Sequence, residues 1–232
     1  RRHCYGDLAP PIIERLLSCS KPIPKNKKIL RRYRRQKQTD KSTRRYFLDG
    51  AHPVWGVELV HCRWLLRGQR FHVGVGGGRK RLNILGAICP EDHEYIDVRV
   101  SKENLNAKKV IRLLHKMHRA HPEVNKFIIY LDNARYHHAV LAKAWIARMK
   151  EKHGVVFQLE FLPPYSPNLN LIERLWKFLK KHALSDWHTS FEAMQQAVAS
   201  VLDHLDQYAD ELKTLMSEHF QLWPDEAWQA RP

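Results

Sequence analysis

Three carboxylic acids stand at points of the sequence where a folded chain would expose them together. Asp49 and Asp132 each follow an apolar run typical of a buried strand, and Glu173 follows a proline-rich turn at the start of a helical pattern. Open α/β sheets bind ligands in the crevice at the carboxyl ends of their strands. Three unpaired carboxylates in one crevice would raise each other's pKa. Hard divalent cations, which prefer oxygen ligands, would relieve that repulsion.

Each acid also has a plainer interpretation. An aspartate after a strand is more often a turn or cap residue, and a glutamate near a helix N-terminus is favoured by the helix dipole. The metal-binding hypothesis therefore rests on the topology, which would bring Asp49, Asp132 and Glu173 together.

The residues before Glu173 define where its helix begins. Pro163, Pro164 and Pro167 prevent a helix before Asn168, because each lacks an N–H and biases the preceding residue toward extended geometry. We expect Asn168 to cap a helix that starts just after it. The apolar stripe of that helix recurs at i, i+3, i+4 and i+7 and consists of Ile172, Leu175, Trp176 and Leu179. Glu173 lies at the edge of this stripe.

The elements that would position these acids follow from apolar periodicity. Strands are predicted at 46–48, 82–88, 94–100, 126–131 and 155–161, with a further strand around 71–73. Helices are predicted at 106–119, 138–152 and 191–223, and a short helical pattern lies within 1–20. We expect Leu141, Trp145 and Met149 on the inner face of the 138–152 helix. Hairpin strands followed by alternating helices and strands predict an α/β fold, a mixed five-stranded sheet flanked by helices with a helical C-terminal tail.

Charge points to the kind of partner. The 232 residues include 40 Lys and Arg against 24 Asp and Glu, a formal net charge of +16. Such an excess indicates a polyanionic partner, with nucleic acid as the first candidate and an acidic membrane surface as the second. No apolar run is long enough to span a bilayer and no signal peptide is evident, so we expect a soluble intracellular protein. Carboxylates that hold Mg²⁺ in so basic a protein point to phosphodiester chemistry.

The basic charge is densest between residues 21 and 45, where Asp40 is the one opposing acid. A block of like charge tends to stay disordered until it meets phosphates, so we predict a linker whose affinity for nucleic acid falls steeply with salt. A solvated tether without a target is the alternative. The candidate DNA contacts in this block are Arg31, Arg32, Arg34 and Arg35.

Further candidates for DNA contact lie near the acids. Lys177 and Lys180, at +4 and +7 from Glu173, share its helix face, and Arg135 follows Asp132 closely. A solvated basic face is the alternative interpretation. Trp145 and Trp176 lie on helix stripes, so we predict that they are core residues rather than platforms for base stacking.

Histidines near the acids raise the question of zinc. His137 and His138 adjoin Asp132, and His52 lies three residues past Asp49. Neighbouring histidines on a helix point in different directions, so zinc is disfavoured. His52 or His137 would instead contact a substrate phosphate or support the carboxylates; packing or capping is the alternative.

Cysteines and glycines give no further site. Cys4, Cys19, Cys62 and Cys89 are far apart and form no CxxC pair, which favours reduced thiols over a zinc ribbon. The glycine cluster at 74–78 neither follows a clear βαβ strand nor opens a helix, so a flexible hairpin or loop is predicted rather than a nucleotide-binding loop.

Four segments together resemble one family. Residues 48–53, 81–87, 132–139 and 162–176 are similar to the IS630 group of the Tc1/mariner transposase superfamily, and the resemblance covers about 46–184. It implies an RNase H-like fold in which Asp49, Asp132 and Glu173 form an acidic triad holding two Mg²⁺ or Mn²⁺ ions.

The resemblance also implies a domain organisation and a reaction. Residues 1–45 would be a basic linker and remnant of an upstream DNA-binding region, 46–184 an RNase H-like DDE catalytic domain, and 185–232 a helical C-terminal extension. One metal would activate water or a DNA 3′-hydroxyl and the other would stabilise the leaving oxygen, so that a transposon end is cut and joined to target DNA. The implied partners are DNA and a second copy in a homodimer or larger synaptic assembly, in a prokaryotic, nucleoid-associated cytoplasmic setting.

The sequence departs from the family pattern at three points. Gly50 and Leu171 stand where many relatives have glutamate and proline, and 40 residues separate Asp132 from Glu173, slightly more than usual. We place the surplus in a longer helix around Ala147 to His153. The first residue is Arg1, so we expect a fragment or processed piece. Two other functions stay open: a non-catalytic DNA-binding relative, and another RNase H-like nuclease.

Overall fold

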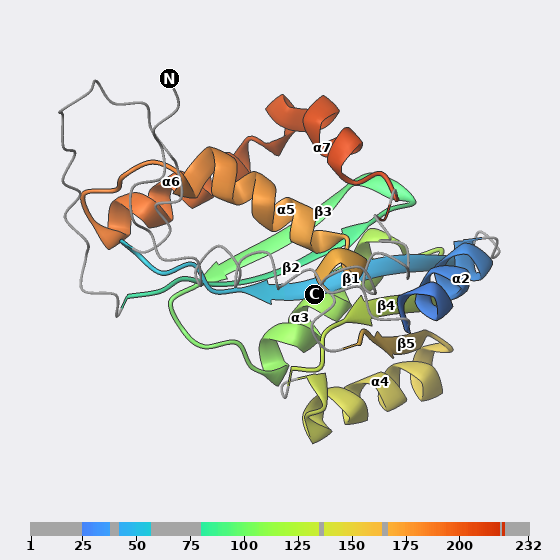
Figure 1. Cartoon of the computed structure of the whole chain (residues 1–232). Helices are drawn as coiled ribbons and strands as arrows, with labels where there is room; N and C mark the ends of the chain where they lie inside the picture. The colour runs from blue at the N-terminus through green and yellow to red at the C-terminus, as the bar shows by residue number, and fades with distance from the viewer. Residues whose placement is uncertain are drawn as a thin grey trace, which may run out of the picture.

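A mixed five-stranded sheet forms the centre of the computed structural model, which describes residues 25–37, 42–56, 80–134, 137–163, 167–218 and 220 (Figure 1). The strand order is β3-β2-β1-β4-β5; β1 pairs antiparallel with β2 and parallel with β4. The strands are β1 (Thr43–Ala51), β2 (Asn83–Cys89), β3 (Asp92–Ser101), β4 (Lys126–Leu131) and β5 (Val156–Phe161). The predicted α/β class and the mixed sheet are confirmed.

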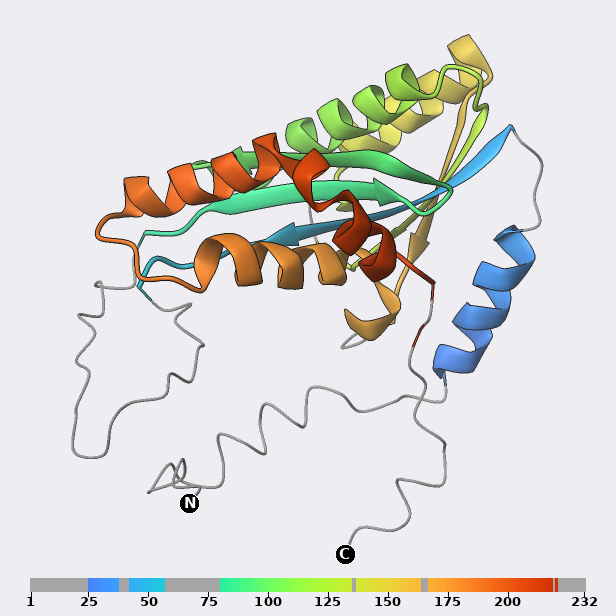
Figure 2. The ribbon, with the colours of Figure 1, turned by 90° about the horizontal axis from the view of Figure 1, so that it is seen from above.

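Helices cover both faces of this sheet. Helices α3 (Ala107–Ala120) and α4 (Val140–His153) lie on one face, whereas α5 (Ile172–Leu179), α6 (Phe191–Asp203) and α7 (Ala209–Leu215) lie on the other (Figures 1 and 2). Helix α2 is Lys25–Lys37. The short turns are η2 (Pro167–Leu169), η3 (Lys180–Leu184) and η4 (Leu205–Tyr208). Within the described ranges, none of the helices has both the length and the apolar character needed to cross a bilayer.

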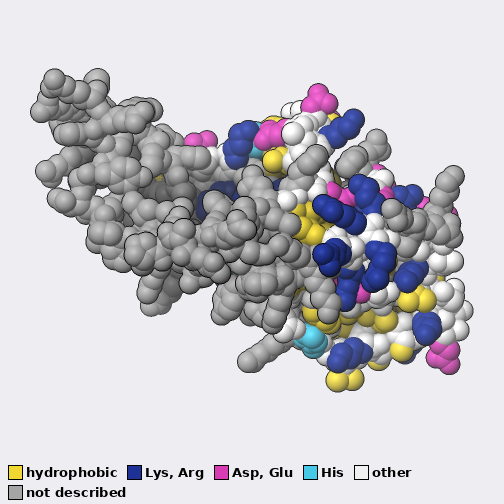
Figure 3. All heavy atoms as spheres, turned by 45° about the vertical axis from the view of Figure 1, so that its right-hand side comes forward, with side chains coloured by type: hydrophobic (Ala, Val, Ile, Leu, Met, Phe, Trp, Pro, Cys, Tyr) yellow, Lys and Arg dark blue, Asp and Glu magenta, His cyan; other side chains and the backbone are white. Residues whose placement is uncertain are grey.

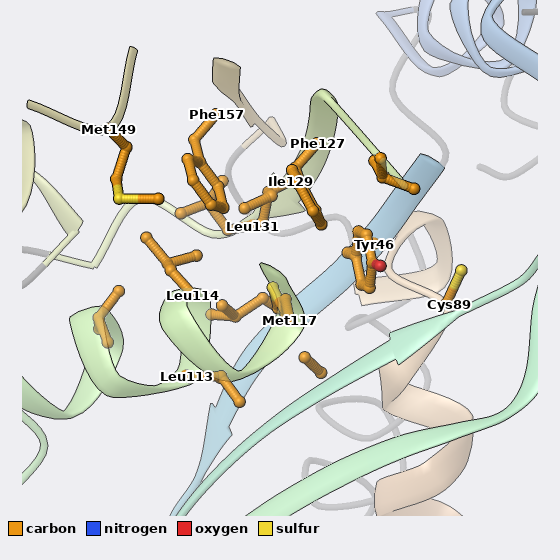
Figure 4. Packing of buried hydrophobic residues seen from close by; sticks show 14 of the residues in the cluster. Tyr46, Cys89, Leu113, Leu114, Met117, Phe127, Ile129, Leu131, Met149 and Phe157 are labelled. Carbon is orange, nitrogen blue, oxygen red and sulfur yellow. The ribbon is translucent and has the colours of Figure 1, made fainter. Parts of the chain in front are cut away.

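Strand β1 is buried on both faces because it lies in the middle of the sheet. Tyr46 and Leu48 point toward α3 and α4, and Phe47 points toward α5. Figure 4 shows Tyr46 among the apolar side chains that α3 and β4 contribute to the first of these cores. A strand between two helical layers reads as a continuous apolar run, which is why 46–48 was predictable from sequence.

Helix α2 corrects the prediction of a disordered linker. Leu30 and Tyr33 are spaced i, i+3, and both are buried against the core. The Tyr33 hydroxyl donates to the Leu169 carbonyl at 2.9 Å, which ties α2 to the turn before α5. An amphipathic stripe within the basic run therefore orders this part of the segment, and the arginines project from the other sides.

A buried arginine holds α2 to the beginning of β1. Arg45 is 1% exposed; its guanidinium donates to Glu218 at 2.8 and 2.9 Å and to Glu91. It also reaches the Tyr33 carbonyl at 3.4 Å. This single side chain joins elements that are distant in sequence.

Replacing Arg45 by alanine is expected to destabilise the protein by about 3 kcal/mol or more, because two carboxylates would lose a buried partner. Urea unfolding of the full chain measures this effect. Arg112→Ala, at an exposed position of α3, is the matched control and should change the free energy of unfolding by less than about 0.5 kcal/mol. Equal effects of the two substitutions would contradict the assigned role of Arg45.

Three further expectations differ from the structure. Leu141 is 49% exposed, and Ala142 is buried in its place, because α4 begins only at Val140 and its inner face is set by the later residues. The predicted 191–223 helix is divided into α6, η4 and α7. Asn168 does not cap α5: it lies within η2, and α5 begins after Leu171 with no side-chain cap.

Some expectations lie outside the described residues. These are the helical pattern within 1–20, the strand at 71–73, the glycine cluster at 74–78, and Cys4, Cys19 and Cys62. Cys89 is described and is a buried free thiol.

Candidate active site

Two of the acids lie side by side because of the register between β1 and β4. These strands run parallel, with Leu48 opposite Leu131. Asp49 and Asp132 are the next residues along the two strands, so both lie where the pairing of β1 with β4 ends. This is the carboxyl edge at which open α/β sheets bind ligands. The predicted end of the first strand at Asp49 was wrong, because β1 continues to Ala51 in its pairing with β2.

The third acid is fixed relative to β1 by Asn170. The Asn170 side-chain amide is buried and donates to the Leu48 carbonyl at 3.3 Å, directly before Asp49. The Glu173 backbone N–H in turn donates to the Asn170 carbonyl at 3.2 Å. The first turn of α5 is therefore held at the level of Asp49. The sequence predicted a role for the neighbouring Asn168 and missed Asn170.

Asp49 and Glu173 line one cavity of about 340 Å³. Lys177 and Lys180 line the same cavity, so both predicted lysines lie beside these two acids. The other lining residues include Gly50, Ala51, His52, Ile84, Trp176 and Leu184. The cavity thus combines carboxylates in its wall with basic side chains, as a phosphodiester substrate with metal ions would require.

The surroundings of the Asp49 carboxyl disfavour its ionised form. Burial, and then the Glu173 carboxylate, raise its pKa to about 7 from an ordinary value of 3.8. A hydrogen bond from the Gly50 backbone N–H opposes the rise in pKa, as does the Trp176 indole N–H, which donates to Asp49 Oδ2 at 3.1 Å. Burial also raises the pKa of Glu173; the Asp132 carboxylate adds to that rise, and Lys177 opposes it. Repulsion from neighbouring carboxylates therefore acts on both Asp49 and Glu173.

Asp132 has a different environment. Its side chain is about half exposed, and His137 Nε2 lies 3.4 Å from its Oδ1. The His137 imidazole, together with an N–H that Ala134 donates at 3.1 Å, lowers the pKa of Asp132. The His137 ring is buried, a position that suits support of the carboxylate rather than exposure to DNA. His138 turns away and stacks on Phe161 with ring centroids 4.4 Å apart.

The donor set fits a hard divalent cation by its chemistry. Asp49, Asp132 and Glu173 offer only carboxylate oxygens, and the raised pKa values of Asp49 and Glu173 reflect burial together with a smaller repulsion between acids that a cation would relieve. In the described ranges, no three His, Cys, Asp or Glu side chains lie close enough together to form a ready-made metal cluster. Asp49 and Glu173 share a cavity, whereas Asp132 lies at the same sheet edge and does not complete a closed set of metal ligands.

His52 is oriented by a buried amide. Its Nδ1 lies 2.9 Å from Asn83 Oδ1, while the Asn83 amide nitrogen donates to the Lys102 carbonyl at 3.3 Å. Because Asn83 presents its oxygen, His52 Nδ1 carries the proton, which leaves Nε2 for another partner. His52 also lines the cavity of Asp49 and Glu173. Sequence reasoning had no signal for Asn83.

The remaining basic candidates lie mostly on α2. Arg31, Arg34 and Arg35 are exposed, while Arg32 is paired with Glu160 of β5. Lys and Arg side chains gather on the face of the molecule around α2 (Figure 3). Arg135 lies outside the described residues.

Comparison with known proteins places the fold. The sequence profile described as DDE superfamily endonuclease matches residues 44–195. A Mos1 transposase paired-end complex with the left transposon end matches with a TM-score of 0.52 at 17% identity, over 95% of this chain and 67% of that one. The mariner Mos1 paired-end complex with Mg matches with a TM-score of 0.52 at 18% identity, over 97% and 68%. Among curated protein sequences there is no significant match.

A third solved structure, a pre-cleavage Mos1 transpososome, gives the same result, with a TM-score of 0.52 at 16% identity over 95% of this chain and 68% of that one. At these identities the likeness establishes the fold. The mixed sheet with helices on both faces is the RNase H-like fold that was predicted from the sequence.

Proposed function

The chain belongs to the DDE endonuclease superfamily, and from this we propose that Asp49, Asp132 and Glu173 are its catalytic acids. The proposed reaction is cleavage of transposon-end DNA followed by transfer of the cut strand into target DNA. The observation that carries the proposal is the register of β1 and β4, which brings Asp49 and Asp132 to one sheet edge, beside the helix that carries Glu173.

The residues of the site have distinct tasks in this proposal. The three carboxylates would hold two Mg²⁺ or Mn²⁺ ions, which supply an activated water or 3′-hydroxyl and stabilise the leaving oxygen. Lys177 and Lys180 neutralise the phosphates of the strand in the cavity. His137 holds the Asp132 carboxylate in its ionised form, and Asn170 holds α5 against β1. Apart from the ions, these tasks are positioning and charge neutralisation.

We also propose that the chain is a member of the IS630 group. The segment from Leu162 to Trp176, with Asn170 and Glu173 in the positions described, is the feature that favours this assignment. One Mos1 structure similar in fold is a paired-end complex with the left transposon end, and another is a paired-end complex with Mg. By analogy we propose DNA ends as substrate and a homodimer or larger assembly as the working form.

The proposed domain organisation keeps a catalytic domain at 46–184 between a basic N-terminal segment and a helical C-terminal extension. The contacts of α2 and α7 show that the flanking regions do not stand apart from this catalytic domain. Arg174, next to Glu173, donates to the Leu215 and Ser217 carbonyls at the end of α7. Elements from both flanking regions therefore pack onto the catalytic core and support the helix of Glu173.

A strand-transfer assay tests the function. The purified full-length protein is incubated with Mg²⁺ and labelled DNA that carries the repeats flanking its own gene. Cut and joined products support a transposase. Binding without cutting would indicate a non-catalytic DNA-binding relative, and loss of the RNA strand from an RNA:DNA hybrid would indicate a different RNase H-like nuclease.

Removing two charges from the cavity is expected to weaken DNA binding in a salt-dependent way. In a Lys177→Gln/Lys180→Gln variant, the slope of log K against log salt should fall by about 2, because each lost phosphate contact removes about 0.9. Fluorescence anisotropy with a labelled end duplex measures the slope. Lys143→Gln/Lys150→Gln, exposed on α4 at the opposite face of the sheet, is the control. Equal slopes for the two variants would refute the predicted contacts.

A further inference from the structure

Trp176 connects the helix of Glu173 to the carboxyl group of Asp49. Its indole N–H donates to Asp49 Oδ2 at 3.1 Å across 127 residues of sequence. Trp176 lies three residues after Glu173, so both side chains project from neighbouring positions on α5. One helix thus supplies one acid of the site and holds another.

The position of the indole is fixed by a glycine on the next strand. Gly86 of β2 is paired with Asp49 of β1. A Cβ at Gly86 would lie 2.6 Å from Trp176 Cη2 and 3.1 Å from Ile172 Cδ1. The first distance is shorter than real Cβ contacts, so the ring lies directly on the backbone of β2 where only glycine leaves room.

We propose that Trp176 is a positioning residue for the metal-binding carboxylate of Asp49 and that Gly86 provides the space it needs. This inference rests on the proposed function. The indole N–H is a donor only, so it cannot itself bind a cation or accept a proton. By holding Oδ2 it restricts the rotation of the Asp49 carboxyl, a torsion that is otherwise broad, and it does so from the side of α5, whereas the Gly50 backbone N–H bonds the same carboxyl from β1.

This role differs from that of the core residue predicted from the sequence. Trp176 is only partly buried, although it packs against apolar clusters on the α5 face. A purely structural tryptophan would affect stability and leave metal affinity unchanged. A positioning tryptophan affects metal affinity, because groups that hydrogen-bond to a metal ligand typically contribute 10- to 100-fold.

The sharpest test replaces one atom. In the full-length protein, Trp176 is exchanged for 3-benzothienylalanine, in which sulfur replaces the N–H and the shape is retained. Mn²⁺ binding is measured by calorimetry without DNA. We expect the Kd for Mn²⁺ to rise about tenfold or more, with a melting temperature within about 2 °C of the wild type. An unchanged Kd would overturn the proposal.

Two substitutions with natural amino acids provide a matched pair. Trp176→Phe should raise the Kd for Mn²⁺ and raise the Mn²⁺ concentration that gives half-maximal nicking by a similar factor. Trp145→Phe, on α4 against Phe157 and remote from the acids, should lower stability without changing the Kd. Equal Kd values for the two variants would refute a specific role for Trp176.

Gly86→Ala tests the space for the ring. The added methyl group must displace the indole, so the Kd for Mn²⁺ should rise as it does in Trp176→Phe. In a Gly86→Ala/Trp176→Phe double variant, the two effects should be less than additive, because both act through the same hydrogen bond. Full additivity would overturn the link between Gly86 and Trp176.

Failure of the proposed function would look different from failure of this inference. Wild-type protein that neither binds Mn²⁺ nor cuts DNA would overturn both. Wild-type protein that binds Mn²⁺ and cuts DNA, alongside a 3-benzothienylalanine variant with the same Kd, would overturn only the role of Trp176.

Discussion

Asp132→Asn and Glu173→Gln are each expected to reduce strand cleavage and strand joining by about three orders of magnitude or more. Each substitution replaces an anionic oxygen by an amide nitrogen of nearly the same shape. Hard divalent cations bind carboxylate oxygens, and an amide lowers the charge that holds them. Both cleavage and joining depend on the same acids, so both should disappear together in an assay with labelled DNA ends.

Neither substitution should unfold the protein. Asp132 is about half exposed, and removing the Glu173 charge relieves repulsion on Asp49. Circular dichroism and urea unfolding should therefore match the wild type or show a slight gain in stability. Glu192→Gln, at an exposed position in the first turn of α6, is the control and should retain activity. Full activity of either Asp132→Asn or Glu173→Gln would refute the catalytic assignment.

Asp49→Asn is expected to inactivate the protein and to stabilise it at pH 8 in the absence of metal. Burial and Glu173 raise the pKa of Asp49 to about 7 in the folded state, against 3.8 as its ordinary value. Because this pKa is higher in the folded than in the unfolded state, the protonated Asp49 carboxyl contributes its full stabilisation of the fold below about pH 4. That contribution is lost as the pH rises to about 7. Asparagine carries no charge to bury, so the variant should be more stable at pH 8 by on the order of 1–4 kcal/mol.

The measurement is urea unfolding in EDTA at pH 5 and pH 8. The free energy of unfolding of Asp49→Asn should clearly exceed that of the wild type at pH 8. The difference should be much smaller at pH 5, where the wild-type Asp49 carboxyl is largely protonated. Adding Mn²⁺ at pH 8 should stabilise the wild type and leave the variant nearly unchanged. Asp203→Asn, at an exposed site at the end of α6, should behave like the wild type at both pH values. A variant less stable than the wild type at pH 8 would contradict this account.

The sequence was most informative where a pattern reports burial. The run at 46–48 predicted a buried strand and the run at 126–131 a strand buried on both faces, and β1 and β4 contain them. The acids were predictable because they end those runs. The 106–119 helix was also predicted closely: Asn106 caps α3 by accepting from the Lys109 N–H, and Val110, Leu113, Leu114 and Met117 are buried.

The rest depended on contacts between distant residues. Asn170 bonds to Leu48 across 122 residues, and Arg45 bonds to Glu218 across 173. Periodicity indicates that Trp176 faces inward, but it does not indicate which polar group its N–H meets. The order of α2 was missed for a related reason: its two buried apolar residues are few among many charges, and only their partners on the core make the helix stable.

The pairing of β1 with β4 has a consequence for how activity should be monitored. Side chains alternate between faces along a strand, so a slip of one residue would exchange the surroundings of Leu48 and Asp49. The acid would then point toward the apolar layer under α3, while the helices and strands kept their lengths. Such a misaligned sheet would give a normal circular dichroism spectrum and yet bind no cation. A preparation of this protein is therefore better judged by the fraction of molecules that take up Mn²⁺ than by its secondary-structure content.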